Sequence, residues 1–143
     1  MKLYTYLNYG GNCRQAFEFY EEHLGGKIKF VTTHGEQPGN TAVLPGWKDA
    51  VLHARMELGE TILLGADIPP DRFKPMRSAY LTLIVDSIAE AERIYGLLSE
   101  GGEIFMPMEE TFFARRFAML RDRFGTSWML LDERAAVTAQ TDA

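Results

Sequence analysis

Residues 16–28 read AFEFYEEHLGGKI, and residues 91–104 read AERIYGLLSEGGEI, a match that needs one extra residue before the paired glycines. The two stretches begin 75 positions apart, at residues 16 and 91. In each copy the apolar residues recur at the spacing of one helix face, and the glycine pair stands where a helix typically ends. The sequence therefore predicts a repeated unit in which a helix ends at glycine and a strand follows.

Both predicted helices have start signals. Ser87 with Glu90, and Asn12 with Gln15, have the spacing of a capping box, in which a side chain at the helix start accepts a backbone N–H three residues on. The same shift of 75 pairs a strand at residues 3–7 with one at residues 78–82. Further strand-like runs follow each helix, at residues 27–33, 51–58 and 60–64 and at residues 103–106, 116–121 and 127–131.

The order strand, helix, three strands therefore occurs twice, which predicts an α+β fold of two βαβββ modules. We expect one domain over residues 1–134, with module one at 1–67, a proline-containing linker at 68–76 and module two at 77–134. The tail at 135–143 is small and polar, and is expected to be flexible. Residues 35–49 predict a long irregular loop, and two interpretations stay open: a lid or binding loop, or a disordered insertion.

Composition excludes several classes of function. The chain has 143 residues and a formal net charge of −5, so electrostatics give no support for nucleic-acid binding. No apolar run approaches the ~20 residues of a membrane span, and residues 1–9 lack the pattern of a signal peptide. The single cysteine, Cys13, rules out an internal disulfide and fits a reducing compartment. We therefore expect a cytoplasmic protein that binds neither nucleic acid nor membrane.

Several strings, taken in order and spacing, carry a resemblance to a known family. They are YLNY at 6–9, GNCRQAFEFY at 11–20, LGG at 24–26, HA at 53–54, GG at 101–102, MPMEET at 106–111, RF at 116–117 and DRFGTSW at 122–128. Together they resemble the PhnB-like branch of the vicinal-oxygen-chelate superfamily, which includes glyoxalases, bleomycin-resistance proteins and extradiol dioxygenases. The resemblance covers about residues 1–133.

The resemblance implies curved mixed sheets that enclose a pocket, and a homodimer. Some members of the superfamily are metal-dependent lyases, isomerases or dioxygenases, whereas others bind drugs such as bleomycin without a metal. Some relatives carry a ubiquinone-methyltransferase label. The chain has no glycine-rich loop after a first parallel strand, so that activity finds no support here.

Metal-dependent members place a ligand on the first and last strand of each module. The repeat puts Thr5, Leu63, Tyr80 and Met129 at these positions, and none is a good ligand for a divalent ion. A register error of one residue would bring in Tyr4 or Tyr6, Ile62 or Leu64, Ala79 or Leu81, and Trp128 or Leu130, which are equally poor. We therefore expect no metal and no cofactor.

The same alignment predicts which side chains line the pocket. We expect Thr5, Leu7, Leu63, Tyr80, Thr82, Phe113 and Met129 to line it, and Tyr6, Leu81 and Trp128 to face the helices. This mixture suits a small, partly apolar ligand held by a few hydroxyl groups. The alternative is that these side chains simply fill the barrel. Trp47, in the long loop, is expected to cover the pocket or a dimer surface.

Three residues are candidates for acid/base or anion-binding roles. His53 is a pocket-facing ligand or acid/base group, or a hydrogen-bonded, half-buried histidine. Glu110, beside two phenylalanines, is an acid or base with a raised pKa, or part of a solvated acidic turn. Arg116 binds an anion, or forms a salt bridge with a carboxylate such as Glu110. His34 is expected to face solvent.

Two functions follow from the sequence. The first is metal-independent binding of a small molecule, as in the drug-sequestering relatives. The second is a lyase or isomerase with a non-standard site made by His53, Glu110 and Arg116, a role that rests on family analogy.

Overall fold

The computed structural model describes residues 1–37, 39 and 43–134. It divides into two compact units, Met1–Pro75 and Met76–Ala143, and each has the order strand, helix, three strands. The expected α+β fold with two βαβββ modules is confirmed. The predicted tail at 135–143 and part of the predicted loop, residues 38 and 40–42, lie outside the described residues.

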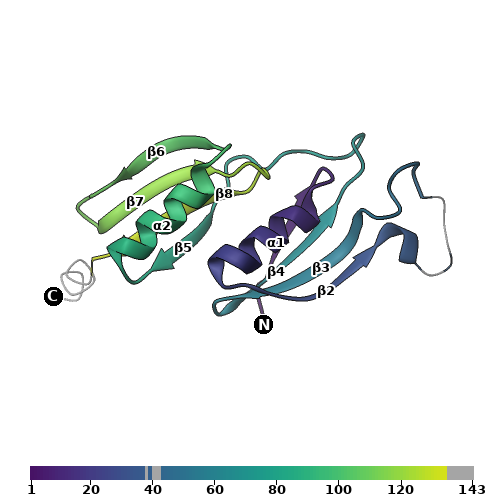
Figure 1. Ribbon diagram of the computed structural model, residues 1–143, viewed down its shortest axis with the longest axis horizontal. Coiled ribbons are helices and arrows are strands. Elements are labelled where there is room, and N and C mark those ends of the chain that lie inside the picture. The colour runs from purple at the N-terminus through teal and green to yellow at the C-terminus, as the bar shows by residue number, and fades with distance from the viewer. Residues whose placement is uncertain (38, 40–42, 135–143) are drawn as a thin grey trace. The chain divides into compact units, whose positions relative to one another are not determined.

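The first unit is a four-stranded sheet with one helix on it (Figure 1). Its elements are β1 (Thr5–Tyr9), α1 (Cys13–Leu24), β2 (Lys27–Thr33), a 3-10 turn η1 (His34–Glu36), β3 (Val51–Leu58) and β4 (Thr61–Asp67). The strand order is β1-β4-β3-β2, with β1 parallel to β4 and the other neighbours antiparallel.

The second unit repeats this arrangement. Its elements are β5 (Leu81–Val85), α2 (Ile88–Ser99), β6 (Glu103–Glu109), β7 (Ala114–Arg121) and β8 (Ser127–Glu133). The strand order is β5-β8-β7-β6, again with the first and last strands parallel and the others antiparallel. Each helix therefore crosses over between two strands of one sheet and covers one face of that sheet.

Each helix buries the apolar stripe that the sequence predicts. In α1 the buried residues are Cys13, Ala16, Phe17 and Tyr20, and in α2 they are Ala91, Ile94 and Leu98. The Phe17 ring meets the ring of Tyr9 in β1 edge-on, with centroids 6.2 Å apart. Burial of one large apolar side chain contributes roughly 1.5–3 kcal/mol. This packing therefore fixes which face of each sheet its helix covers. We call the opposite face, which the helix of the same unit does not cover, the uncovered face.

The two helix starts differ in how they are capped. At α2 the hydroxyl of Ser87 accepts the backbone N–H of Glu90 at 3.0 Å, as expected. At α1 the Asn12 side chain makes no capping hydrogen bond, so that expectation is wrong. The carboxylate of Asp67, at the end of β4, accepts the backbone N–H groups of Gly11 and Cys13 instead. A strand residue thus supplies the helix cap, which local sequence spacing does not reveal.

The DRFGTSW string builds the tight connection between β7 and β8. Oδ1 of Asp122 accepts the backbone N–H groups of Phe124 and Thr126, both at 3.0 Å. Oδ2 of Asp122 accepts the indole N–H of Trp128 at 2.9 Å. Gly125 has a φ of 101°, which a side chain would strain. This family motif is therefore explained by turn structure and core packing.

In the described residues, no helix has the length and apolar character needed to cross a membrane.

Candidate functional site

Gly65 identifies the side of the first sheet that α1 covers. A β-carbon placed on Gly65 would lie 2.8 Å from the Phe17 ring, so this position points to the helix. Leu7 pairs with Gly65 in the parallel β1–β4 ladder, and Leu63 lies two residues before it. Both side chains therefore point to α1 and are 3% and 1% exposed. The expectation that Leu7, Leu63 and Thr5, two residues before Leu7, line the uncovered face is wrong.

The error arises because the helices and the first strands repeat at different spacings. The helices start at residues 13 and 88, which are 75 apart, but β1 and β5 start at residues 5 and 81, which are 76 apart. The shift of 75 residues, taken from the helices, matches Thr5 with Tyr80, whereas the strand starts match Thr5 with Leu81. A slip of one residue in a strand moves every side chain to the opposite face. Tyr6, expected to face the helix, lies on the uncovered face and is 50% exposed.

The uncovered face of the first sheet carries an aromatic cluster of Tyr6, Phe30 and His53. The Tyr6 hydroxyl lies 3.2 Å from Nδ1 of His53, and the two rings stack with centroids 5.7 Å apart. The Phe30 ring lies 5.4 Å from the His53 ring. Burial, and to a smaller extent Cys13, raises the pKa of Tyr6, which keeps its hydroxyl protonated. His53 is a half-buried, hydrogen-bonded histidine on the face of the first sheet that α1 does not cover.

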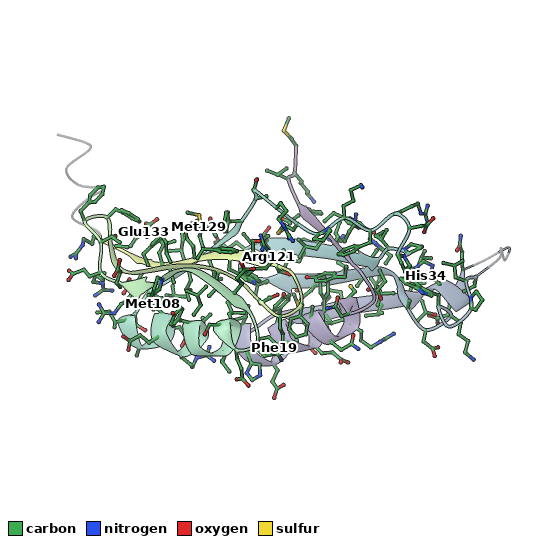
Figure 2. The ribbon with its side chains drawn as sticks, turned by 90° about the horizontal axis from the view of Figure 1, so that it is seen from above. Phe19, His34, Met108, Arg121, Met129 and Glu133 are labelled. Carbon is green, nitrogen blue, oxygen red and sulfur yellow. The ribbon has the colours of Figure 1, made fainter. Side chains whose placement is uncertain are left out.

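The uncovered face of the second sheet is apolar. Thr82 pairs with Met129, and the Thr82 hydroxyl lies 3.9 Å from the Met129 sulfur. Figure 2 shows Met129 on the side of the sheet away from α2. Phe113 meets Phe117 with ring centroids 5.0 Å apart. We call this set the methionine face, and its residues are Thr82, Phe113, Phe117, Met119, Met129 and Leu131.

Tyr80 stands just before β5. Its ring meets the ring of Phe105 in β6 edge-on at 6.3 Å, and the guanidinium of Arg121 lies 4.9 Å from the centre of the Phe105 ring. Tyr80 is therefore held in place by aromatic packing within the second unit.

One pair of residues occupies equivalent central positions on each uncovered face. Tyr6 pairs with Leu64, and Thr82 pairs with Met129. In metal-dependent members of the resembled superfamily, first-strand and last-strand positions supply the ligands. These four side chains include no carboxylate and no imidazole, so they do not fit a divalent ion. Within the described part of the chain, no three histidine, cysteine or acidic side chains are grouped to hold a metal.

The other two candidates are both engaged in ion pairs. The carboxylate of Glu110 pairs with the guanidinium of Arg134 and is largely exposed. Nε of Arg116 lies 3.2 Å from Oε1 of Glu92 in α2, so Arg116 points toward the helix. The salt bridge expected for Arg116 is thus present, but its partner is Glu92. Glu110 and Arg116 belong to the second unit and His53 to the first.

His34 is half-buried rather than solvent-facing, so that expectation is wrong. Its Nε2 lies 3.2 Å from the backbone oxygen of Asp67, and its ring meets the Trp47 ring edge-on at 5.7 Å. These contacts anchor the start and the end of the long loop to the first unit, because His34 precedes the loop and Trp47 lies near its end.

Asp67 is important for the structure of the first unit, and the sequence analysis did not identify it. Its side chain is 2% exposed, and it accepts three backbone N–H groups, from Gly11, Cys13 and Val51, at 2.9–3.1 Å. Burial first, and Asp67 second, raises the pKa of Cys13 to about 12, so this thiol is unreactive at neutral pH. A signal was present in the repeat, since the last strand of each module has an aspartate at or next to its end, Asp67 in β4 and Asp132 in β8, and both are buried.

In the second unit the equivalent aspartate has a different partner. Asp132 lies at the end of β8, and the guanidinium of Arg115 lies 2.9 Å from its Oδ1 and 2.7 Å from its Oδ2. Ser87 caps α2, so Asp132 is not needed for that purpose. The two aspartates therefore hold matching strand ends by different means.

Comparison with known proteins now places the chain. A family model described as the Glyoxalase/Bleomycin resistance protein/Dioxygenase superfamily matches residues 5–130. The chain belongs to this superfamily. Among solved structures of the superfamily fold, protein PA1353 from Pseudomonas aeruginosa is 39% identical, with a TM-score of 0.84 and coverage of 93% of this chain and 98% of that one.

Two further relatives connect this superfamily member to named proteins. Protein YjdN from Escherichia coli strain K12 is 29% identical over 140 residues, which is 91% of this chain and 94% of YjdN. A Bacillus cereus structure described as a putative 3-demethylubiquinone-9 3-methyltransferase, PhnB protein, is 24% identical with a TM-score of 0.78, and covers 92% of this chain and 98% of that one. The latter likeness shows the shared fold alone.

Proposed function

We propose that this superfamily member, of the PhnB-like branch, binds a small, partly apolar molecule on the uncovered faces of its sheets without a metal ion at the superfamily position. The observation that carries the proposal is the identity of the central pairs, Tyr6 with Leu64 and Thr82 with Met129. A hydroxyl, a thioether and an alkyl group favour apolar contact and a few hydrogen bonds over coordination of a cation.

The two faces suggest the character of the ligand. The first offers the stacked Tyr6 and His53 rings, which join a hydrogen-bonding edge to a flat aromatic surface. The second offers the methionine face, whose long flexible side chains adapt to irregular apolar shapes. A ring with one polar substituent suits the first face, and an apolar body of irregular shape suits the methionine face.

A lyase or isomerase is the second candidate function, and one observation favours it. His53 is hydrogen-bonded to a tyrosine hydroxyl on an uncovered face, which is an arrangement able to exchange a proton with a bound molecule. Glu110 and Arg116 give it little support, because both are engaged in ion pairs, with Arg134 and Glu92. If this activity exists, we expect His53 rather than Glu110 or Arg116 to carry it.

We also propose a homodimer, which the superfamily implies, in the reducing environment of the cytoplasm. An exposed apolar run on the edge strand β6, made by Ile104, Phe105 and Met106, is a surface that a second copy would cover. Light scattering on eluted protein tests this, with a mass of about twice the chain's 16.2 kDa as the supporting result.

A fragment screen by ligand-observed NMR tests the binding proposal. We expect ring-containing hits whose affinity is unchanged by EDTA. A hit on the first sheet is expected to bind about tenfold more weakly to Tyr6→Ala, and a hit on the methionine face about tenfold more weakly to Met129→Ala, since each variant removes a large contact. Met108→Ala is the matched control. Figure 2 shows Met108 on the side of the second sheet that carries α2, opposite to Met129. Affinity that depends equally on Met108 and Met129, or that EDTA abolishes, would contradict the proposal.

A further inference from the structure

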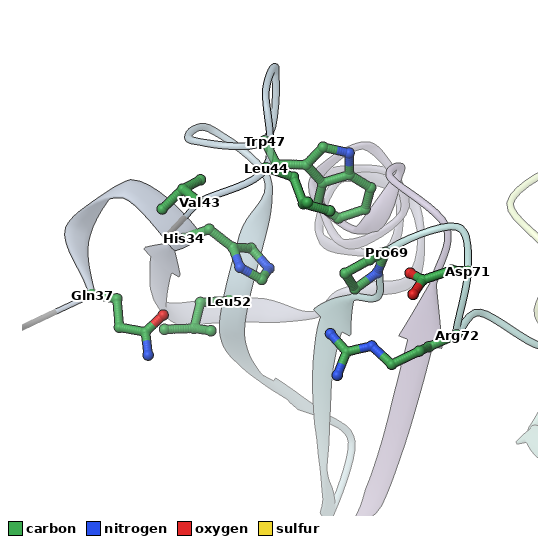
Figure 3. Close-up of a pocket in the computed structure, with 9 residues that line it drawn as sticks. All are labelled: His34, Gln37, Val43, Leu44, Trp47, Leu52, Pro69, Asp71 and Arg72. Atoms are coloured by element: carbon green, nitrogen blue, oxygen red, sulfur yellow. The ribbon is translucent and has the colours of Figure 1, made fainter. Parts of the chain in front are cut away.

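A cavity of about 550 Å³ opens in the first unit beside the long loop. Its lining includes His34, Leu44, Trp47, Leu52 and Arg72, none of which belongs to the uncovered faces described above. This volume lies within the range of sites that hold small molecules. Figure 3 shows Trp47 and Leu44 on one side of the cavity, with His34 and Leu52 forming another part of its wall.

The aromatic wall of the cavity is held in place by the surrounding structure. Nε2 of His34 lies 3.2 Å from the backbone oxygen of Asp67, and the Trp47 ring stands at 87° to the His34 ring. Gly35 donates its backbone N–H to Lys48 at 2.8 Å, which ties the two ends of the loop together. A ligand ring that enters here meets a wall that is already ordered, so binding loses little conformational entropy.

The positively charged side chain of Arg72 lies across the cavity from these rings. The Arg72 side chain extends toward His34 and Leu52 (Figure 3), and within the described residues it forms no hydrogen bond or ion pair. Backbone bonds from Arg72 and Phe73 to the oxygen of Pro69 fix the turn that carries it. Its guanidinium therefore retains its full set of donors in a site that is otherwise mainly apolar, and it can bind a carboxylate through two of them.

Two neighbouring features affect where a carboxylate ligand would bind. A second cavity of about 540 Å³ lies at Trp47 and Arg14, near the start of α1. There the carboxylate of Asp67 already occupies the N–H groups of Gly11 and Cys13, so a second anion is repelled. Asp71 lines the first cavity next to Arg72 and is not paired with it in the described residues, so it opposes anion binding without cancelling it.

We propose that this cavity is a binding site for a small carboxylate with an aromatic body. The carboxylate sits on Arg72, and the ring packs against Trp47, His34 and Leu44. The site is separate from the uncovered faces to which the main function is assigned, and the first unit holds it without any residue of the second.

Proton–nitrogen NMR with phenylacetate as the probe tests the proposal. The chain has two tryptophans, and the indole N–H of Trp128 is bonded to Asp122 inside the second unit. Only the indole signal of Trp47 is expected to move on titration, and the signal of Trp128 serves as an internal reference. Phenylacetamide, which has the same ring and no charge, is expected to bind about tenfold more weakly.

Three variants make the test specific. Arg72→Gln is expected to weaken phenylacetate binding about tenfold and to leave phenylacetamide unchanged. Asp71→Asn is expected to strengthen phenylacetate binding, since it removes a nearby like charge. Arg77→Gln, at an exposed arginine bonded to the oxygen of Met76, is the matched control and is expected to change nothing.

Tyr6→Ala and Met129→Ala are also expected to leave phenylacetate binding intact, so failure of this proposal and failure of the main one are distinguishable. The proposal is overturned if the Trp47 signal does not move, if acid and amide bind equally, or if Arg72→Gln binds phenylacetate as tightly as the parent protein.

Discussion

At the scale of single residues, the Asp67 carboxylate joins three segments of the first unit. It accepts N–H groups from the loop before α1, from α1 itself and from the start of β3. The bonds from Cys13 and Val51 are buried, so each of these two donors that loses its acceptor costs about 1–3 kcal/mol. The residue therefore couples the start of the helix to the end of the long loop.

Asp67→Asn tests this coupling. An amide keeps one acceptor oxygen and turns an NH₂ group toward N–H donors, so we expect a loss of about 2–4 kcal/mol of unfolding free energy. Urea unfolding followed by circular dichroism measures it. Asp49→Asn, at an exposed aspartate of the same loop, is the control and is expected to change stability little. Equal stability of the two variants would contradict the role of Asp67.

The buried thiol of Cys13 predicts a pH dependence of stability. Burial, with Asp67 as the second cause, raises its pKa from 9.0 to about 12. A raised pKa means that folding favours the protonated thiol, so this contribution is complete below about pH 9 and is lost as the pH rises toward 12. We expect the unfolding free energy of the parent to fall over this window more than that of Cys13→Ala.

Urea unfolding of parent and Cys13→Ala at several pH values measures the difference between them. Other groups that titrate in alkali are common to both proteins and cancel in the comparison. Parallel loss of stability in the two proteins would show that the thiol ionises freely in the folded state.

At the scale of elements, two glycines of the second unit differ in what surrounds them. A β-carbon on Gly102 would lie 2.3 Å from the backbone oxygen of Arg121, whereas one on Gly96, in α2, would meet no atom within 4 Å. We expect Gly102→Ala to destabilise the protein by about 2 kcal/mol or more through the backbone clash. Gly96→Ala is expected to stabilise it by about 0.5–1 kcal/mol through helix propensity.

Thermal unfolding of the two alanine variants checks this contrast with the same chemical change at both sites. A melting temperature of Gly102→Ala equal to or above that of the parent would show that close packing does not require glycine at this position.

The element scale also explains which expectations the sequence supported. Helix faces and glycine stops are local patterns, so α1 and α2 were predicted well from residues such as Phe17, Tyr20 and Ala91. The first strands are short, and the shift taken from the helices is one residue too small for them. That single residue moved Tyr6 to the wrong face in prediction. Asp67, whose partners lie up to 56 residues away, carries no local pattern.

At the scale of the whole molecule, two units with one topology present different uncovered faces. The first displays Tyr6, Phe30 and His53, and the second displays Thr82, Met129 and their apolar neighbours. For the second sheet, the sequence reasoning matched Tyr80 with Met129, whereas the structure pairs Thr82 with Met129. Tyr80 and Thr82 are two residues apart, so this difference does not change the expected face. The repeat thus preserves the strand pairing while the side chains it presents have diverged.

The most direct measurement of the central claim is elemental analysis by inductively coupled plasma mass spectrometry on protein purified without chelators and then dialysed. With Tyr6, Leu64, Thr82 and Met129 at the central positions, the account predicts far less than one divalent ion per chain, both before and after addition of zinc, manganese or nickel followed by gel filtration. One tightly held divalent ion per chain, released when Tyr6 or Thr82 is replaced by alanine, would contradict it.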